Sequence, residues 1–168
     1  MRYLIGLLLL IISTTSSAQT VKDYIRNDWP DSRYEVHDNG TTTDTYTGLM
    51  WKVCSEGQTW SSPATCSGNA TSYNWQQALE LANSASFAGF DDWRLPNIAE
   101  LRSLAAKNCY SPAINVTVFP NTPSIWFWSS SPYGLYSNGA WFVNFSNGHD
   151  ITTSRSVAER VRLVRAGQ

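Results

Sequence analysis

Two stretches of the chain carry apolar residues at helical spacing, and each begins with a capping pair. Asn74 is followed three residues later by Gln77, and Asn97 by Glu100, which is the spacing of a capping box. We expect the first helix to run until Gly89. The apolar positions line one face of each predicted helix: Trp75, Ala78, Leu79 and Ala82 in the first, and Ile98, Leu101, Leu104 and Ala105 in the second.

Alternating and β-branched residues predict strands in two parts of the chain. Residues 34–37 alternate, residues 38–40 are typical of a turn, and residues 41–53 are rich in threonine and apolar side chains. This pattern predicts a hairpin that leads into a buried strand. In the last third, residues 125–128 and 140–145 are typical of two further strands.

The last third continues with a strong hairpin signal. Asn147-Gly148 predicts that residues 149–153 return antiparallel to the strand before them. Trp141 is expected to be a structural residue on one face of that strand, and residues 161–164 are expected to end the sheet. The whole pattern predicts one α+β domain over residues 34–168, with two helices packed on a mostly antiparallel sheet.

The N-terminal segment differs in character from the rest. Residues 1–18 combine a positive start, an apolar run and small residues up to Ala18, which predicts a signal peptide cleaved after Ala18. The apolar run is short for a membrane span, so we expect no span after cleavage; an uncleaved anchor is the alternative. The expected location is periplasmic, cell-surface or extracellular. Residues 19–33 form a polar arm that we expect to be loosely held.

Composition and charge exclude several classes of protein. Eight Trp and eight Tyr, with 15% charged residues, favour a compact aromatic-rich fold over a disordered one. A formal net charge of -1 provides no positive field for general nucleic-acid binding. Two histidines and three cysteines show no spacing typical of a metal site, so neither a metal nor another cofactor is expected.

The cysteines are Cys54, Cys66 and Cys109, an odd number for an exported protein. Cys54 and Cys66 flank a short loop of small and polar residues, and we expect a disulfide between them that contributes about 3 kcal/mol if it is unstrained. Cys109 is then left over, as a buried thiol or as a link to another chain. A bridge from Cys109 to Cys54 or Cys66 is the alternative.

The segment that precedes the second helix contains a candidate structural clamp. Trp93 is expected to be buried. Arg94 lies between two apolar residues, and a half-buried guanidinium requires carboxylate or carbonyl partners. We expect Asp91 or Asp92 to be that partner, so that Arg94 is structural; a ligand-binding Arg94 is the alternative.

Six motifs in a fixed order carry a resemblance to a known family. They are Gly40-Thr41 with Thr47-Gly48-Leu49-Met50-Trp51, Trp75-Gln76-Gln77-Ala78, Gly89-Phe90-Asp91-Asp92-Trp93-Arg94-Leu95-Pro96-Asn97 with Glu100-Leu101, Pro112-Ala113-Ile114-Asn115, Trp128-Ser129-Ser130-Ser131, and Val161-Arg162-Leu163-Val164-Arg165. From Arg33 to Arg165 the chain resembles bacterial domains similar to the C-terminal domain of the Legionella collagen-like adhesin. This resemblance, and a weaker one to the group that includes formylglycine-generating enzymes, implies a C-type-lectin-like fold. It also implies sulfated or otherwise anionic cell-surface glycans as the ligand class.

Residues 129–139, between two predicted strands, have the composition of a binding loop. Tyr133 and Tyr136 offer rigid amphipathic rings, while serines, glycines and Asn138 offer adaptable hydrogen bonds. We therefore expect residues 129–156 to make the partner contacts. A plain polar loop is the alternative, because such composition is common in loops.

Arginines near the C-terminus add a candidate anion site. Arg162 and Arg165 are expected to pair with aspartates 91 and 92 or with carbonyls. Arg155 and Arg160 are expected to remain available for a ligand, because guanidinium groups match sulfate, carboxylate and phosphate. Arg102 or Lys107 would extend this patch if the ends of helix and strand meet. The expected ligand-binding residues are Tyr133, Tyr136, Asn138, His149, Arg155 and Arg160.

No catalytic set can be assembled from the candidate residues. Ser130, His149 and Asp150 lack a Gly-x-Ser-x-Gly motif, and an adjacent His and Asp do not suit a triad. We therefore expect an exported, non-catalytic binding module for surface adhesion or recognition of anionic glycans. A protein-binding or assembly subunit of the cell envelope, or an unrecognised hydrolase, is the alternative. The chain has no collagen repeat, so multivalent display would require a homo-oligomer.

Overall fold

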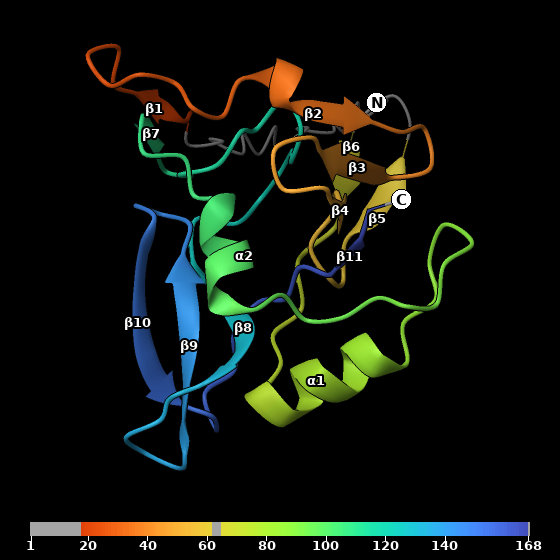
Figure 1. Cartoon of the computed structure of the whole chain (residues 1–168), viewed down its shortest axis with the longest axis vertical. Coiled ribbons are helices and arrows are strands. Elements are labelled where there is room, and N and C mark those ends of the chain that lie inside the picture. The colour runs from red at the N-terminus through yellow and green to blue at the C-terminus, as the bar shows by residue number, and fades with distance from the viewer. Residues whose placement is uncertain (1–17, 62–64, 168) are drawn as a thin grey trace, which may run out of the picture.

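The computed structural model describes residues 18–61 and 65–167 (Figure 1), so all of the predicted signal peptide except Ala18 lies outside the described residues. The helices are η1 (Asp31–Arg33), α1 (Trp75–Asn83) and α2 (Ile98–Ser103). The strands are β1 (Thr20–Val21), β2 (Tyr34–Val36), β3 (Thr41–Asp44), β4 (Leu49–Lys52), β5 (Thr59–Ser61), β6 (Thr65–Ser67), β7 (Cys109–Tyr110), β8 (Trp126–Pro132), β9 (Gly139–Asn144), β10 (His149–Ser154) and β11 (Val164–Ala166). Within the described ranges, no helix is long and apolar enough to cross a membrane.

The strands form four small antiparallel sheets, with orders β11-β4-β3-β2, β10-β9-β8, β5-β6 and β1-β7. Strands make up 33% of the structure and helices 12%, so the protein is mostly β. The expectation of an α+β, C-type-lectin-like domain built from two helices and a single sheet is therefore wrong, because the strands are divided among four sheets. The main difference concerns β11, which was expected to end the sheet of β8, β9 and β10 but pairs with β4. As a result β11 joins β2, β3 and β4 in a separate four-stranded sheet.

The helices begin where the capping pairs predicted, but both end early. Asn74 and Asn97 each accept a hydrogen bond from the backbone of the glutamine or glutamate three residues on, and that side chain bonds back to the asparagine backbone. α1 ends at Asn83, well before Gly89, and Ser84 caps it: its hydroxyl donates to backbone carbonyls of the last turn, at 3.1 and 3.2 Å. α2 ends at Ser103, although the apolar pattern continues beyond it.

The sheet of β8, β9 and β10 separates two apolar clusters. On one face, Phe127, Val143 and Phe145 pack with α2 and with Trp51 of β4; on the other, Trp128 and Phe142 pack with α1 and Trp93. Figure 1 shows α2 in front of this sheet and α1 below and to the right of it. Since both faces of β9, the inner strand, are largely buried, the sheet fixes the positions of the loops at its ends.

The N-terminal arm is anchored, so the expectation that residues 19–33 are loosely held is wrong. The buried Trp29 donates its indole N–H to the Ser103 carbonyl at 2.7 Å, next to the end of α2. Arg33 is also buried and donates from Nε and Nη2 to the two carboxylate oxygens of Asp44, at 2.8 and 2.5 Å. Gln19 donates from Nε2 to two backbone carbonyls at 2.7 Å.

Arg162 and Arg165 are structural, as the sequence predicted. Arg165 pairs with Asp92 at 2.6 Å. Arg162 is fully buried, donates to the Lys52 and Val53 carbonyls and lies over the Phe119 ring at 4.8 Å. Burial lowers the pKa of Arg162 to about 9, because the charged form loses its hydration.

Candidate functional site

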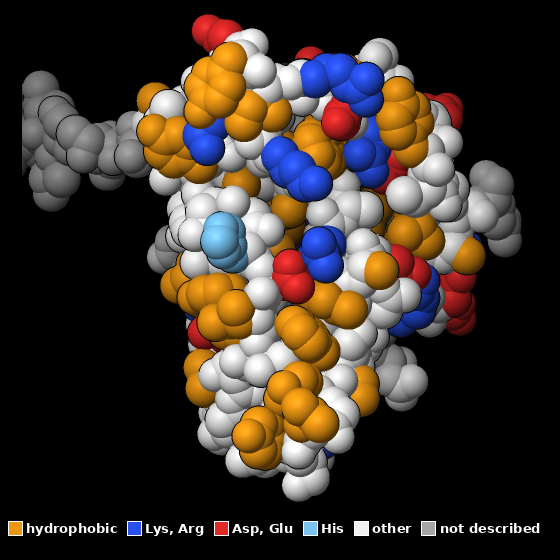
Figure 2. Space-filling model, turned by 60° about the vertical axis from the view of Figure 1, so that its left-hand side comes forward, with side chains coloured by type: hydrophobic (Ala, Val, Ile, Leu, Met, Phe, Trp, Pro, Cys, Tyr) orange, Lys and Arg blue, Asp and Glu red, His pale blue; other side chains and the backbone are white. Residues whose placement is uncertain are grey.

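The loop that joins β8 to β9, here called the tyrosine loop (residues 133–139), gathers aromatic rings at one end of the molecule. The ring centre of Tyr133 lies 5.6 Å from that of Tyr136 and 5.6 Å from that of Trp141. Backbone hydrogen bonds of 3.0 Å, from Tyr133 to Gly139 and from Gly139 to Tyr136, close the loop. Leu135 and Tyr136 are 78% and 66% exposed. Figure 2 shows hydrophobic side chains gathered toward the lower end of one face.

Arg155 fastens the base of the tyrosine loop. Its backbone N–H donates to the Asn138 carbonyl at 2.8 Å, and its Nε donates to the Gly139 carbonyl at 3.0 Å. The guanidinium carbon lies 4.2 Å from the ring centre of Trp75, whose indole N–H is held by the Ser129 carbonyl at 2.8 Å. The loop is therefore tied at both the backbone and side-chain level to β10 and to the first turn of α1.

An open hollow of about 460 Å³ lies beside this base, between the start of α1 and the turn that follows β10. Its lining is Asn74, Trp75, Gln76, Leu79, Arg155 and Ser156. The hollow combines an indole ring, amides and a guanidinium, which are groups that stack on and hydrogen-bond to polar ring-shaped ligands.

The structure brings together four of the six expected ligand-binding residues, namely Tyr133, Tyr136, Asn138 and Arg155. His149 lies elsewhere: it pairs with Asn144, at the opposite end of β10 from Ser154, which adjoins the loop. These ends are five residue steps apart along the strand, a span of about 17 Å.

Arg160 also lies away from the tyrosine loop. Its backbone lies along the edge of β8 that faces away from β9, where it forms an isolated parallel bridge with Phe127. Its Nη1 donates to the Ser72 hydroxyl. Its Nε is buried without a hydrogen-bond partner in the described structure. Arg160 therefore does not line the hollow beside Arg155.

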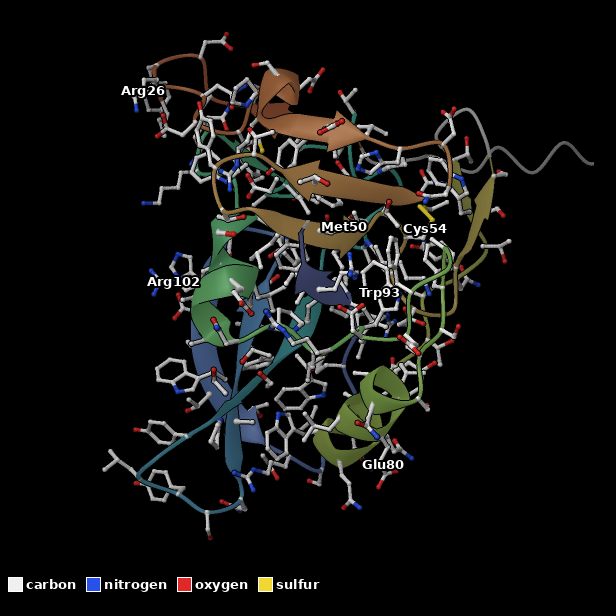
Figure 3. All side chains as sticks on the ribbon, turned by 45° about the vertical axis from the view of Figure 1, so that its right-hand side comes forward. Arg26, Met50, Cys54, Glu80, Trp93 and Arg102 are labelled. Atoms are coloured by element: carbon white, nitrogen blue, oxygen red, sulfur yellow. A yellow bond between two sulfur atoms is a disulfide. The ribbon has the colours of Figure 1, made fainter. Side chains whose placement is uncertain are left out.

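Arg102 and Lys107 form a separate basic area. Arg102 pairs with Asp150 of β10 at 3.2 Å, near the His149 end of that strand. Figure 3 shows Arg102 pointing outward from α2. The two basic residues border a hollow of about 350 Å³ with Trp29 and Gly148, at the other end of the sheet from the tyrosine loop.

Arg94 has a different partner from the one expected. It forms two parallel hydrogen bonds with Glu100 at 2.7 Å, whereas Asp92 is taken by Arg165. The hydrogen bonds that Arg94 donates to Glu100 raise the pKa of Arg94. Burial alone would raise the pKa of Glu100, but the hydrogen bonds donated by Arg94 and by the Asn97 backbone outweigh burial and lower that pKa. Glu100 thus closes the α2 capping box and holds Arg94. Trp93 is buried, as expected, in the middle of the molecule (Figure 3).

The predicted disulfide is present between Cys54 and Cys66, with 5.4 Å between the Cα atoms. It joins the end of β4 to the β5–β6 ribbon (Figure 3). Cys109 is a free, buried thiol, and burial raises its pKa. A high thiol pKa keeps the nucleophilic thiolate scarce at neutral pH.

One family model matches residues 40–165 of the chain, from the β2–β3 turn to β11. The matching family is the Lcl C-terminal domain. The chain belongs to this family. A comparison with curated proteins finds no match. Membership of the Lcl C-terminal domain family makes the protein an adhesin-like or binding module, and the Cys54–Cys66 disulfide is consistent with export.

Sequence reasoning missed the part that α1 plays in the site of this Lcl C-terminal domain. Trp75 was assigned only to the helix face that packs on the sheet, yet its ring also supports the Arg155 guanidinium. Trp141 was assigned a purely structural role, yet it is partly exposed beneath Tyr133. One feature of the sequence could have indicated this role of Trp75: it is the first residue after the N-cap, so its side chain lies at the end of the helix and not in the middle of the packed face.

Proposed function

We propose that this domain is an exported, non-catalytic adhesin-like module that binds anionic, including sulfated, glycans at the tyrosine loop and the adjoining Arg155–Trp75 hollow. The rings of Tyr133 and Tyr136 offer apolar faces for sugar rings, and Arg155 offers a fixed positive charge beside them. Asn138 is exposed at the surface of the loop and adds amide hydrogen bonds.

One observation carries this proposal: within the part of the chain that the structure describes, Arg155 has no carboxylate partner and keeps its terminal amino groups unused. Five other described arginines form ion pairs, namely Arg26, Arg33, Arg94, Arg102 and Arg165; Arg162 is buried, and Arg160, which also lacks a carboxylate partner, donates to the Ser72 hydroxyl. Arg155 uses Nε for the loop, and in the described chain neither terminal amino group forms a hydrogen bond. A partly exposed guanidinium with two unused amino groups is suited to a sulfate or carboxylate.

The test is binding of the purified mature chain to a sulfated polysaccharide, a neutral polysaccharide and a non-sugar polyanion. We expect sulfated-glycan binding that weakens from about 50 to 200 mM salt, because exposed charges are screened over about 8–10 Å. Arg155→Gln removes this binding, whereas Arg102→Gln, at a more exposed arginine paired with Asp150, retains it. Equal binding of the non-sugar polyanion would overturn glycan recognition.

Tyr136→Ala gives an independent measure, with Tyr46→Ala as the matched control. The two tyrosines are 66% and 72% exposed, but Tyr46 lies in the turn between β3 and β4. We expect only Tyr136→Ala to weaken glycan binding, with both melting temperatures within a few degrees of the parent, as is usual for surface changes. Equal loss in both variants would remove the tyrosine loop from the site.

A protein partner is the second candidate function, and the exposed apolar tip favours it. Leu135 and Tyr136 are adjacent in the loop and strongly exposed, which suits a buried anchor in a protein interface. Leu135→Ser distinguishes the two: it leaves glycan binding unchanged in the first case and weakens capture of an envelope protein in the second. Salt-insensitive binding to the neutral polysaccharide would instead indicate ring stacking without an anion requirement.

A further inference from the structure

We propose that the outer edge of β10 is a self-association surface, through which a second copy of this chain adds its own β10 antiparallel to the first. The resulting two-fold dimer joins two three-stranded sheets into one. This inference goes beyond glycan or protein recognition at the tyrosine loop and does not depend on it.

The edges of the larger sheets differ in how they are protected. The outer edge of β8 is met by Arg160 in a parallel bridge with Phe127, and the outer edge of β11 by Arg94 in an antiparallel bridge with Val164. β2, the edge of the four-stranded sheet, is three residues long and has Glu35 at its centre. These features are common ways of blocking edge-to-edge pairing.

β10 is less protected: no isolated bridge of the described residues covers it, and its one acidic residue, Asp150, lies near one end of the strand and is paired with Arg102. It is six residues long, pairs regularly with β9 over its whole length, and contains no proline, lysine or bulge. Among the described residues, its only backbone hydrogen bond to a segment other than β9 is accepted by Ser154 from Val157, at the end of the strand. Figure 1 shows β10 at the margin of the molecule, with no described segment beyond it. Its outer row of backbone donors and acceptors is therefore available for pairing.

The sequence of β10 is self-complementary in one register. With Ile151 opposite Ile151 of the second copy, Asp150 faces Thr152 and His149 faces Thr153. The strand contains no other ionisable side chain, so no like charges are directly opposite each other, and Asp150 keeps its own partner, Arg102. Threonine and isoleucine are β-branched and favour cross-strand packing.

The same register continues an apolar row across the joint sheet. Trp128, Phe142 and Ile151 are directly opposite one another in β8, β9 and β10, on one face of the sheet. Trp128 and Phe142 are buried, but Ile151 at the margin is 49% exposed. Pairing two copies places the exposed ends of two such rows against each other, which removes both from water.

The test measures the mass of the mature chain in solution by sedimentation over a range of concentrations. We expect a concentration-dependent dimer that Ile151→Lys converts to a monomer, because two lysines would then face each other at the two-fold axis. Val36→Lys is the matched control: Val36 is also 49% exposed and also lies in an edge strand, but in the other sheet. A monomer at all concentrations, or equal loss of the dimer in both variants, overturns the proposal.

Single cysteines then test the register. Ile151→Cys is expected to form an intermolecular disulfide on mild oxidation, because directly opposite Cβ atoms in such pairs lie about 4.5–5.5 Å apart. Thr153→Cys lies on the same face but opposite His149, about 13 Å from its own counterpart in strand geometry, and should not cross-link. Preferential cross-linking of Thr152→Cys or Thr153→Cys refutes the register. The buried Cys109 provides the same background in every variant.

Discussion

Replacing Asp44 with alanine is expected to lower the free energy of unfolding by about 3–5 kcal/mol. The change removes both carboxylate oxygens of Asp44, which accept hydrogen bonds from Arg33 at 2.8 and 2.5 Å, and Arg33 is only 6% exposed. A buried charge that loses its partner has a penalty of this size because it is neither hydrated nor paired. At about 2–4 °C per kcal/mol for a chain of this length, the melting temperature should fall by about 6–20 °C.

Thermal and urea unfolding, followed by circular dichroism, measure this change. Asp28→Ala is the matched control, because Asp28 pairs with Arg26 at 2.6 Å on the surface and should cost less than about 1 kcal/mol. Arg33→Met combined with Asp44→Ala should recover much of the loss, since no unpaired charge is left. An Asp44→Ala penalty as small as that of the control would mean that the N-terminal arm moves away and lets water reach Arg33.

The same pair predicts the acid response. Burial alone would raise the pKa of Asp44, but the hydrogen bonds and charge of Arg33 outweigh it, so the pKa lies below its usual value. A depressed carboxyl pKa stabilises the fold above the unfolded-state pKa of about 3.9, and the stabilisation is lost as pH falls through the folded-state value. Asp44→Asn should therefore flatten the loss of stability below about pH 4.

Three further results are expected. Arg94→Ala should lower the free energy of unfolding by less than about 1 kcal/mol, because the Arg94 side chain is 45% exposed in its pair with Glu100; a loss of about 2–4 kcal/mol in urea unfolding would restore the buried-clamp interpretation. Replacing Cys54 and Cys66 together with serine should cost about 2–4 kcal/mol in the same assay, and an unchanged midpoint would show that the ribbon needs no disulfide. Cys109 should resist alkylation until the protein unfolds, as read by mass spectrometry; rapid labelling of the folded protein would contradict its burial.

Local signals in the sequence were sufficient for the elements that depend on neighbouring residues. The capping boxes at Asn74 and Asn97 act over three residues, so the sequence located both helix starts correctly. The turn signal at Asn147-Gly148 likewise predicted the return of β10. The Cys54–Cys66 bridge closes a short loop and was predicted from spacing alone.

The pairing of distant segments was not readable in the same way. Val164 has an apolar, β-branched side chain that suits either sheet, and no local pattern indicates that its partner is Trp51. The exchange of partners around Arg94 has the same origin: Asp91 and Asp92 are near in sequence, but Arg165 arrives from the far end of the chain and takes Asp92. In the candidate site, the loop was predicted by composition, whereas the support from Trp75 depends on the tertiary position of α1.

The pairing of β11 with β4 has a consequence for the order of folding. β11 consists of residues 164–166 and lies beside residues 49–52, so the four-stranded sheet lacks an edge strand until residues 164–166 have been synthesised. Arg162, just before β11, fills a site formed by the Lys52 and Val53 carbonyls, which stays open for the same period. Contacts of such long sequence separation form late, because the loop between them must close first. A growing chain therefore completes the four-stranded sheet only after its local hairpins and helices, because β11 is synthesised long after β4.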